Sequence, residues 1–186
     1  FIGGNGDANN ISGANAIQCE NLYLYMTRAI ICTGGYGYAG KNGYSGTTNG
    51  RHGTDGENGY IGGTGGSAIV ANTLDIKCNN QDNSVLVLTG GGGGNGGNGG
   101  NGGQGKNCDA NILEKCNPGN GGNAGIGGSG GDSGYSLLIE NSITGNLLPL
   151  LSSNASLTTR GGGNKGNNGT PGKRGYCGCW FNFDNA

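Results

Sequence analysis

Proline is scarce in this chain, which has 3 prolines and 48 glycines among 186 residues. A collagen triple helix has glycine at every third position and proline at roughly 15–20% of positions, so the low proline content argues against collagen. Long apolar runs are also missing, and none approaches the roughly 20 residues that a transmembrane helix needs. The sequence therefore predicts a protein without a membrane span.

Charge and histidine are similarly sparse. The 10 basic and 11 acidic residues give a net charge of −1, so the chain lacks the basic surface of a nucleic-acid-binding protein. The single histidine, His52, lies beside Asp55 and Glu57 in a glycine-rich stretch, where we expect a solvated polar turn. Cys177 and Cys179 could bind a metal together with Cys108, Cys116 or His52, but no second Cys-x-x-Cys motif or histidine cluster supports a zinc site. A Ser-His-Asp or Cys-His arrangement needs a positioned nucleophile and an orienting group, which the sequence does not indicate, so we expect no catalytic residue, enzymatic activity, cofactor or metal.

Glycine recurs at every third residue in separate runs: Gly34 to Gly46, Gly50 to Gly65, Gly90 to Gly105, Gly119 to Gly134 and Gly163 to Gly178. This period equals the three residues per turn of the polyproline II helix, and only glycine fits where such helices pack backbone to backbone. A disordered glycine-rich linker is the alternative. However, the phase holds throughout each run and the runs alternate with apolar segments, which favours ordered polyglycine II rods.

Three apolar segments separate the glycine runs, and they are Ala16 to Thr33, Ser67 to Thr89 and Tyr135 to Arg160. Each reads as a strand, a polar turn and a second strand, and the third includes the apolar stretch Leu147 to Leu151. We predict a mainly β fold with polyglycine II rods, an internal repeat of apolar double strands alternating with Gly-x-x rods, and little or no α-helix. The chain is expected to form a single repeat domain, 1–186, with approximate units 13–66, 67–134 and 135–178 and a C-terminal aromatic tail, 179–186.

Each pair of rods is expected to leave the apolar strands, turn at a tip and return. The first tip is a slip in the glycine phase at Thr47 to Asn49, and the second is the insertion Lys106 to Pro118. At the amino end, Gly3 and Gly6 read as the remainder of a returning rod. Some asparagines are expected to project from the rods and add side-chain hydrogen bonds, namely Asn95, Asn98, Asn101 and Asn123.

All seven cysteines are candidates for disulfide bonds: Cys19, Cys32, Cys78, Cys108, Cys116, Cys177 and Cys179. Cys108 and Cys116 flank the second tip, so a disulfide between them would close a short loop. Cys19, Cys32 and Cys78 lie in predicted strands and are placed to link neighbouring repeats. Because the number is odd, one thiol is left free or bonded outside the chain.

Three asparagines lie in N-glycosylation sequons: Asn10, Asn154 and Asn168. The chain begins with Phe1 rather than methionine, as after removal of a signal peptide. Disulfides form in oxidising compartments, so the cysteines point the same way as the sequons. We therefore expect a secreted or cell-surface protein that carries N-linked glycans.

The run from Gly90 to Asn101, with its Gly-Gly-Asn triplets, and the run from Gly163 to Gly178 resemble the polyglycine II helix bundle proteins. The best-known members are springtail antifreeze proteins and the adhesin tips of some phage long tail fibres. The resemblance implies antiparallel rods that are hydrogen-bonded into a two-layer or hexagonal bundle. This chain departs from both families by its three apolar double strands.

The leading functional hypothesis is a subunit of an extracellular fibre, filament or matrix. The repeat is open at both ends, and unpaired backbone groups at an open edge favour association with further copies of the same chain. We expect the amino-terminal stretch, with Phe1 and Ile2, to dock against residues 163–178 of a neighbouring copy. Trp180, Phe181 and Phe183 are expected to anchor this contact.

Two alternatives belong to other classes of protein. An adhesin module for carbohydrates or cell surfaces would use the tyrosines and the tip loops. An ice-binding protein would need small apolar or threonine residues repeated on one face, whereas the exposed positions here mix Asn, Lys, Tyr and Thr.

Overall fold

The computed structural model describes residues 1–26, 28–78, 85–107, 119–145, 155–159, 164, 167 and 169–173. The chain divides into two compact units, and each unit is built from segments that lie far apart in the sequence. Unit 1 comprises residues 1–40, 61–96 and 129–165, and unit 2 comprises residues 41–60, 97–128 and 166–186. Each predicted repeat therefore contributes to both units.

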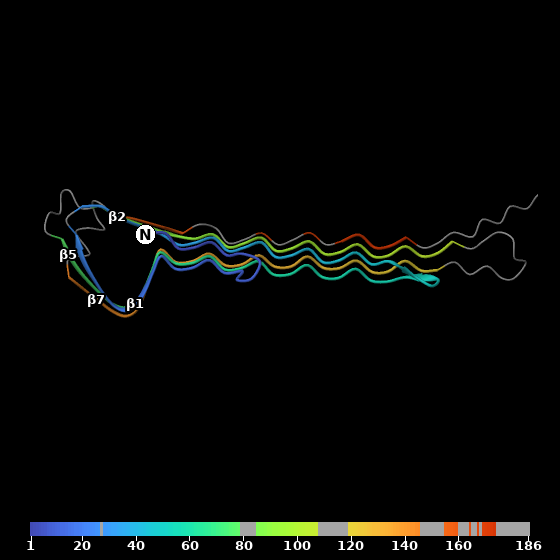
Figure 1. Ribbon diagram of the computed structural model, residues 1–186, viewed down its shortest axis with the longest axis horizontal. Coiled ribbons are helices and arrows are strands. Elements are labelled where there is room, and N and C mark those ends of the chain that lie inside the picture. Colours follow the sequence, from blue (N-terminus) through green and yellow to red (C-terminus); the bar gives the residue numbers. More distant parts are fainter. Residues whose placement is uncertain are drawn as a thin grey trace, which may run out of the picture. The chain divides into compact units, whose positions relative to one another are not determined.

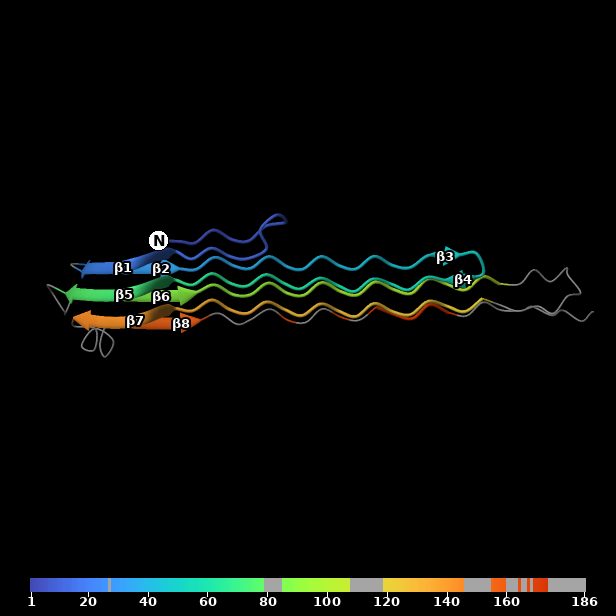
Figure 2. The same ribbon diagram turned by 90° about the horizontal axis from the view of Figure 1, so that it is seen from below.

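Unit 1 contains two parallel β-sheets of three strands each (Figure 1). The first has the order β1 (Ile17–Met26), β5 (Ile69–Cys78) and β7 (Leu137–Gly145). The second has the order β2 (Ile30–Thr33), β6 (Leu86–Gly90) and β8 (Ala155–Thr159). Figure 2 shows equivalent strands of successive repeats side by side. Parallel neighbours require long crossover connections, and the glycine runs supply them here.

The register of the strands places equivalent residues of successive repeats next to one another. Ile17 pairs with Ile69, and Ile69 pairs with Leu137. A β-bulge interrupts this register between β5 and β7, because β7 has one more residue than β5 between the pairs Ala71–Ile139 and Thr73–Ser142. The repeat therefore stacks like the coils of a solenoid, in which each repeat contacts its neighbours.

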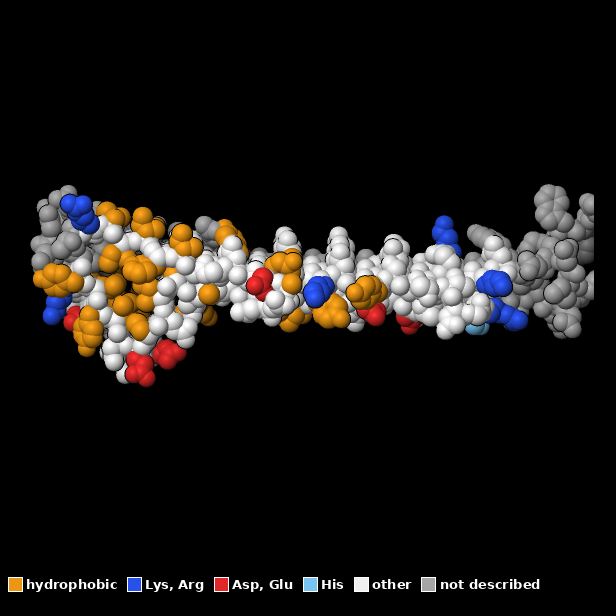
Figure 3. Space-filling view, viewed as in Figure 1, with side chains coloured by type: hydrophobic (Ala, Val, Ile, Leu, Met, Phe, Trp, Pro, Cys, Tyr) orange, Lys and Arg blue, Asp and Glu red, His pale blue; other side chains and the backbone are white. Residues whose placement is uncertain are grey.

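The hydrophobic core of unit 1 lies between the two sheets. Buried side chains come from the first sheet (Leu24, Leu74, Ile76) and from the second (Cys32, Leu86, Leu88). Figure 3 shows hydrophobic side chains gathered over the strands of this unit. Alternate residues of β6 are buried, as the two-residue period of a strand with one covered face requires. Burial of one such Leu or Ile contributes about 1.5–3 kcal/mol.

The predicted pair of strands is confirmed in each of the three apolar segments, and the residues predicted as turns in the second and third segments lie outside the described residues. The stretch from Leu147 to Leu151 lies outside the described residues. No described residue is helical, so the prediction of a mainly β chain with little or no α-helix is confirmed over that part of the chain.

The regular secondary structure described in unit 2 is a short hairpin of β3 (Thr48–Asn49) and β4 (His52–Gly53). Its turn has Gly50 at the first central position with a φ of 59°, which favours glycine and suits a type II′ turn. This hairpin is the tip that the sequence shows as a slip in the glycine phase. Residues 108–118 of the second predicted tip lie outside the described residues.

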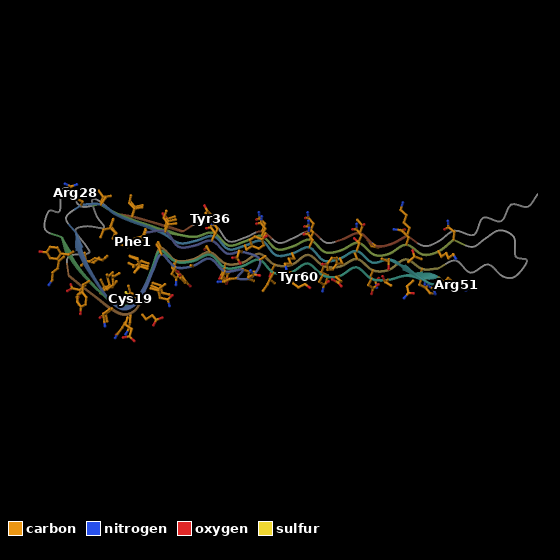
Figure 4. The ribbon with its side chains drawn as sticks, viewed as in Figure 1. Phe1, Cys19, Arg28, Tyr36, Arg51 and Tyr60 are labelled. Carbon is orange, nitrogen blue, oxygen red and sulfur yellow. The ribbon has the colours of Figure 1, made fainter. Side chains whose placement is uncertain are left out.

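The glycine-rich segments fall into two sets that run in opposite directions. The first, second, third and fourth outgoing segments are residues 1–6, 34–47, 90–106 and 164–173, the last described at residues 164, 167 and 169–173. The first, second and third return segments are residues 11–15, 54–67 and 119–135. Figure 4 shows side chains leaving these segments at regular intervals, with Tyr36 on the second outgoing segment and Tyr60 on the second return segment.

The direction predicted for the amino end is wrong. Ile2 forms a parallel bridge with Thr33, and the amides of Gly3 and Gly6 donate to the carbonyls of Thr33 and Tyr36 at 2.8 and 2.7 Å. Residues 1–6 are therefore an outgoing segment. The chain reverses in the turn 7–10, and a three-residue period cannot reveal that reversal because it is the same in both directions.

Candidate functional site

Each triplet of the glycine-rich segments directs its backbone amides toward different neighbours. In unit 2, Gly99 donates to the carbonyl of Asn167 on the fourth outgoing segment at 2.8 Å. Gly100 donates to the carbonyl of Glu57 on the second return segment at 2.7 Å. The amide of Asn101 donates to the side chain of Ser45 on the second outgoing segment at 3.3 Å. Every amide of this triplet is thereby satisfied without any bond inside its own segment.

The close approach of neighbouring backbones explains why glycine occupies the first two positions of such triplets. A Cβ atom added at Gly100 would overlap the carbonyl group of Tyr44, and backbone atoms cannot move aside as a flexible side chain can. By contrast, a Cβ added at Gly4 would meet nothing within 4 Å. The requirement for glycine therefore depends on whether a segment has neighbours on that side.

The third position of the triplet carries side chains that accept hydrogen bonds from the next segment. Asn98 Oδ1 accepts from the amide of Asn167, and the amide of Asn98 donates to Asn42 Oδ1, each at 2.8 Å. Asn95, Asn101 and Gln104 accept in the same way from the amides of Asn164, Thr170 and Lys173. We call this arrangement the side-chain ladder. The accepting side chain always lies on the earlier segment in the sequence, and the donating amide lies on the later one.

The return segments, with β4 directly before the second of them, have an equivalent ladder. In unit 2, His52 Nδ1, Asp55 Oδ1 and Asn58 Oδ1 accept from the amides of Asn120, Asn123 and Ile126 at 3.1, 2.6 and 2.8 Å. The prediction of side-chain bonds from Asn95, Asn98 and Asn101 is confirmed. Asn123 contributes its backbone amide instead, because it lies on the later segment of its pair.

The two rows of third-position side chains in unit 2 differ in charge. The outgoing segments present amides and hydroxyls, with one charged member at the end of the row: Asn42, Ser45, Asn98, Asn101, Gln104, Asn167, Thr170 and Lys173. The return segments mix charged, polar and apolar groups: His52, Asp55, Asn58, Asn120, Asn123 and Ile126. The outgoing row is therefore a nearly uncharged, regularly spaced polar surface.

One edge of unit 2 is covered by side chains. The second outgoing segment has Lys41, Tyr44 and Thr47, and the second return segment has Thr54, Glu57 and Tyr60. The equivalent positions of the third outgoing and third return segments are all glycine. The residues of the second outgoing and second return segments join these two segments through backbone bonds, including that from the Glu57 amide to the Tyr44 carbonyl at 2.8 Å. Tyr44 and Tyr60 are 76% and 56% exposed. Large side chains are tolerated here because no described segment packs on this side.

The strands of unit 1 present open edges. β1 and β7 are the end strands of their sheet, and within the described residues no strand pairs with the outer edge of either. Ile143 on β7 is 46% exposed although its partner Leu74 is buried. At the second sheet, the amino terminus covers part of β2, since the Phe1 amine donates to the Ile31 carbonyl at 2.7 Å. Over the described residues of unit 1, the outer edges of β1 and β7 are the longest strand edges without a paired strand.

Two of the predicted assembly residues, Phe1 and Ile2, lie beside β2 in the first repeat. Phe1 and Ile2 are 72% and 84% exposed, on a segment whose other side pairs with residues 33–36. Trp180, Phe181 and Phe183 lie outside the described residues. The expected contact between residues 1–13 and residues 163–178 of another copy stays a prediction.

The two cysteines whose side chains are described are free thiols. Cys19 on β1 has Ala71 as its register partner, and Cys32 on β2 has Leu88, so neither faces a cysteine of the next repeat. Burial raises the pKa of the Cys32 thiol, and the positive charge of the nearby amino terminus offsets part of this increase. Cys78 ends β5, and Cys108, Cys116, Cys177 and Cys179 lie outside the described residues. A pairing among these others stays a prediction.

Asn10 is exposed in the turn that joins the first outgoing and return segments. Asp7 Oδ1 accepts from the amides of Asn9 and Asn10, each at 2.8 Å, and holds this turn. The sequon asparagine is therefore accessible, and its glycosylation stays a prediction. Asn154 and Asn168 lie outside the described residues.

Side chains that could bind a metal ion do not cluster in the described residues. These residues contain no group of three His, Cys, Asp or Glu side chains that could hold a metal ion. Within the same residues, no helix is long and apolar enough to cross a membrane. His52 lies in β4, where its ring serves the side-chain ladder.

These features define the class of the protein as an open repeat with parallel sheets and hydrogen-bonded glycine-rich segments. No family model and no curated protein matches the chain. A solved structure that matches is the springtail antifreeze protein from Granisotoma rainieri, a bundle of nine polyproline type II helices whose crystal waters match the ice lattice. The identity is 21%, the match covers 95% of this chain and 94% of that chain, and the TM-score is 0.24. With so low a TM-score, the match carries no argument about fold or function.

Proposed function

We propose that the protein is a structural subunit that stacks with copies of itself into an extracellular fibre, filament or matrix. The observation that carries the proposal is the pair of open edges on β1 and β7, which belong to one parallel sheet. Because all strands of the sheet point the same way, β7 of one copy can pair with β1 of the next. Such a contact is head-to-tail and does not close, so it produces a filament.

The pairing inside the chain supplies the template for the pairing between copies. Ile17 and Leu137 both pair with Ile69, and Leu22 and Ile143 both pair with Leu74. Stacking with the same geometry sets Ile17 of one copy beside Leu137 of another, and Leu22 beside the half-exposed Ile143. The contact would remove apolar surface from water and satisfy the unpaired backbone of both strands.

The extracellular location is part of the proposal and rests on composition. Seven cysteines and three sequons suit an oxidising, glycosylating compartment. The glycine-rich segments would act as the extended part of the subunit, and we assign them the polyglycine II conformation on the strength of their period and their hydrogen bonds to neighbouring segments.

A charge at the open edge tests the proposal. Ile143→Lys should abolish concentration-dependent assembly, because a desolvated ammonium would replace an apolar contact. Ile126→Lys is the matched control, since Ile126 is 57% exposed and belongs to unit 2, whereas the two parallel sheets belong to unit 1. Electron microscopy and sedimentation of the native, unreduced protein at low and high concentration give the readout. A wild-type protein that stays monodisperse at every concentration would overturn the proposal.

A second candidate function is ice binding, which the nearly uncharged outgoing row of unit 2 favours. A polar side chain recurs at each triplet of this row, which gives the regular spacing that a match to a lattice requires, and Thr170 is the row's one threonine. Thermal hysteresis of the monomer measures this activity. Asn101→Lys should reduce it by placing a charge within the row, whereas Asn123→Lys on the return segments should leave it unchanged.

Carbohydrate binding is a third candidate, favoured by the exposed rings of Tyr44 and Tyr60 on the covered edge of unit 2. Tyrosine rings offer an apolar face and a hydroxyl to a sugar. Binding of the monomer on a glycan array would support this function, provided that Tyr44→Ala and Tyr60→Ala weaken the signal.

A further inference from the structure

The side-chain ladder of unit 1 ends at groups that have no partner in the described part of the chain. In the return segments, Asn15 Oδ1 accepts from the amide of Ser67, and Ser67 Oγ accepts from the amide of Tyr135. The neighbouring row, one triplet earlier, contains Ser12, Thr64 and Asp132. The Ser12 hydroxyl accepts from Thr64 Oγ1 at 3.1 Å, but the amide of Ser12 makes no hydrogen bond to the described residues. At the later end of this row, the exposed carboxylate of Asp132 likewise accepts none.

Ser12 and Asp132 are equivalent positions of their segments. The Gly13 amide donates to the Thr64 carbonyl, and the Gly65 amide donates to the Asp132 carbonyl, each at 2.8 Å. These two bonds align Ser12, Thr64 and Asp132 in one row across the first, second and third return segments. The row therefore has an unused amide at one edge and an unused acceptor at the other.

The direction of the ladder fits a contact between copies. Between parallel neighbours of the side-chain ladder, the acceptor lies on the earlier segment and the amide on the later one, as with Asp55 and Asn123 at 2.6 Å. In a stack, the last return segment of one copy precedes the first return segment of the next. Asp132 is then in the accepting position, and Ser12 of the next copy is in the donating position.

The strand edges require the same register. Leu137 follows Asp132 by as many residues as Ile17 follows Ser12, and Ile17 and Leu137 share the partner Ile69. A stack that pairs β7 with β1 in the template register therefore also brings Asp132 opposite Ser12. One placement of the second copy satisfies both edges.

We propose that the Asp132 carboxylate accepts a hydrogen bond from the Ser12 amide of the next copy and thereby fixes the register of the stack. This inference rests on the proposed self-assembly. Hydrogen bonds to a carboxylate are stronger than those between neutral groups, which suits a register device at an exposed edge. It also counters slippage, to which parallel edges without a fixed partner are prone.

Substitution of Asp132 tests the bond. Asp132→Ala should raise the concentration for half-maximal assembly by about tenfold, because the acceptor is lost. Asp132→Asn should fall between wild type and the alanine variant, because asparagine keeps an acceptor, as at Asn15 and Asn58, but makes the weaker bond of a neutral group. Ser129→Ala, one triplet away on the same segment, is the matched control and should have no effect. An Asp132→Ala protein that assembles like wild type would overturn the inference, and its thermal melt checks that the subunit is folded.

Cross-linking tests the register. Ser12→Cys combined with Asp132→Cys should give an intermolecular disulfide on mild oxidation, identified by peptide mapping. Ser12→Cys with Ser129→Cys should not, since Ser129 lies about 9 Å away along the segment if the rise is that of polyproline II. Filaments that lack the first cross-link or form the second would overturn the register and leave the proposed function intact. A wild-type chain that never assembles would overturn both.

Discussion

At the residue scale, one asparagine joins three segments of unit 2. The amide of Asn98 donates to Asn42, its carbonyl accepts from Gly43, and its side chain accepts from Asn167. The side chain therefore satisfies an amide that would otherwise have only water as a partner. This explains why asparagine, with its short side chain and carbonyl oxygen, recurs in the glycine-rich segments.

Removing this acceptor should weaken the fold. We expect Asn98→Ala to lower the free energy of unfolding by about 1 kcal/mol, measured by urea denaturation. Asn98→Asp keeps an oxygen in the same place and serves as the control, with a loss well below that of alanine. Equal losses for the two variants would argue against the role of the acceptor.

The turn at Asp7 gives a pH-dependent prediction. The amides of Asn10 and Asn9 donate to its carboxylate and hold the pKa of Asp7 below its usual value of 3.8. Since the folded pKa is the lower one, this stabilisation is present above the usual pKa and is lost as the pH falls through the folded value. As the pH falls through the folded pKa of Asp7, hydrogen exchange of the Asn9 and Asn10 amides should accelerate relative to that of amides in the sheets. Asp7→Asn should remove the pH dependence of this difference.

At the element scale, the number of glycines in each triplet reflects how many neighbours a segment has. The third outgoing segment has two glycines in triplets such as Gly96-Gly97-Asn98, and its backbone is bonded to outgoing segments on both flanks and to return segments. The second outgoing segment has one glycine in Gly43-Tyr44-Ser45, at the covered edge of unit 2. Glycine is kept where backbone meets backbone and is replaced where a segment faces solvent.

A pair of alanine substitutions tests this reading. Gly100→Ala should destabilise the protein by about 3 kcal/mol, because the methyl group would force the neighbouring backbone away. Gly4→Ala should be neutral or stabilising by up to about 1 kcal/mol, because the site is open and alanine restricts the unfolded chain. Thermal melts of the two variants make the comparison, and similar melting temperatures would contradict it.

Much of this organisation could be predicted from the sequence, for physical reasons. Strand pairs show as short apolar runs, and glycine-rich segments show as a strict period, because both patterns are local. The direction of residues 1–6 could not be predicted, since it depends on the turn at Asp7. The partners of β1 and β7 could not be predicted either, because strand pairing joins residues as far apart as Ile17 and Ile69. The number of glycines in each triplet could have distinguished the inner segments from the outer ones.

At the scale of the whole molecule, covered and open edges are used differently. The Lys41, Tyr44, Glu57 and Tyr60 side chains cover an edge of unit 2, as natural proteins do to prevent unwanted pairing. In unit 1, no strand of the described residues pairs with the outer edge of β1 or of β7. The contrast supports the proposal that association is confined to the sheets and the segments next to them.

The parallel order of β1, β5 and β7 has one more consequence. Copies stacked through this sheet are all oriented alike, so a filament has polarity, with β1 exposed at one end and β7 at the other. Subunits would then add at the two ends with different rate constants, as the two surfaces differ in side chains. Anchoring one end to a cell would set the direction of growth.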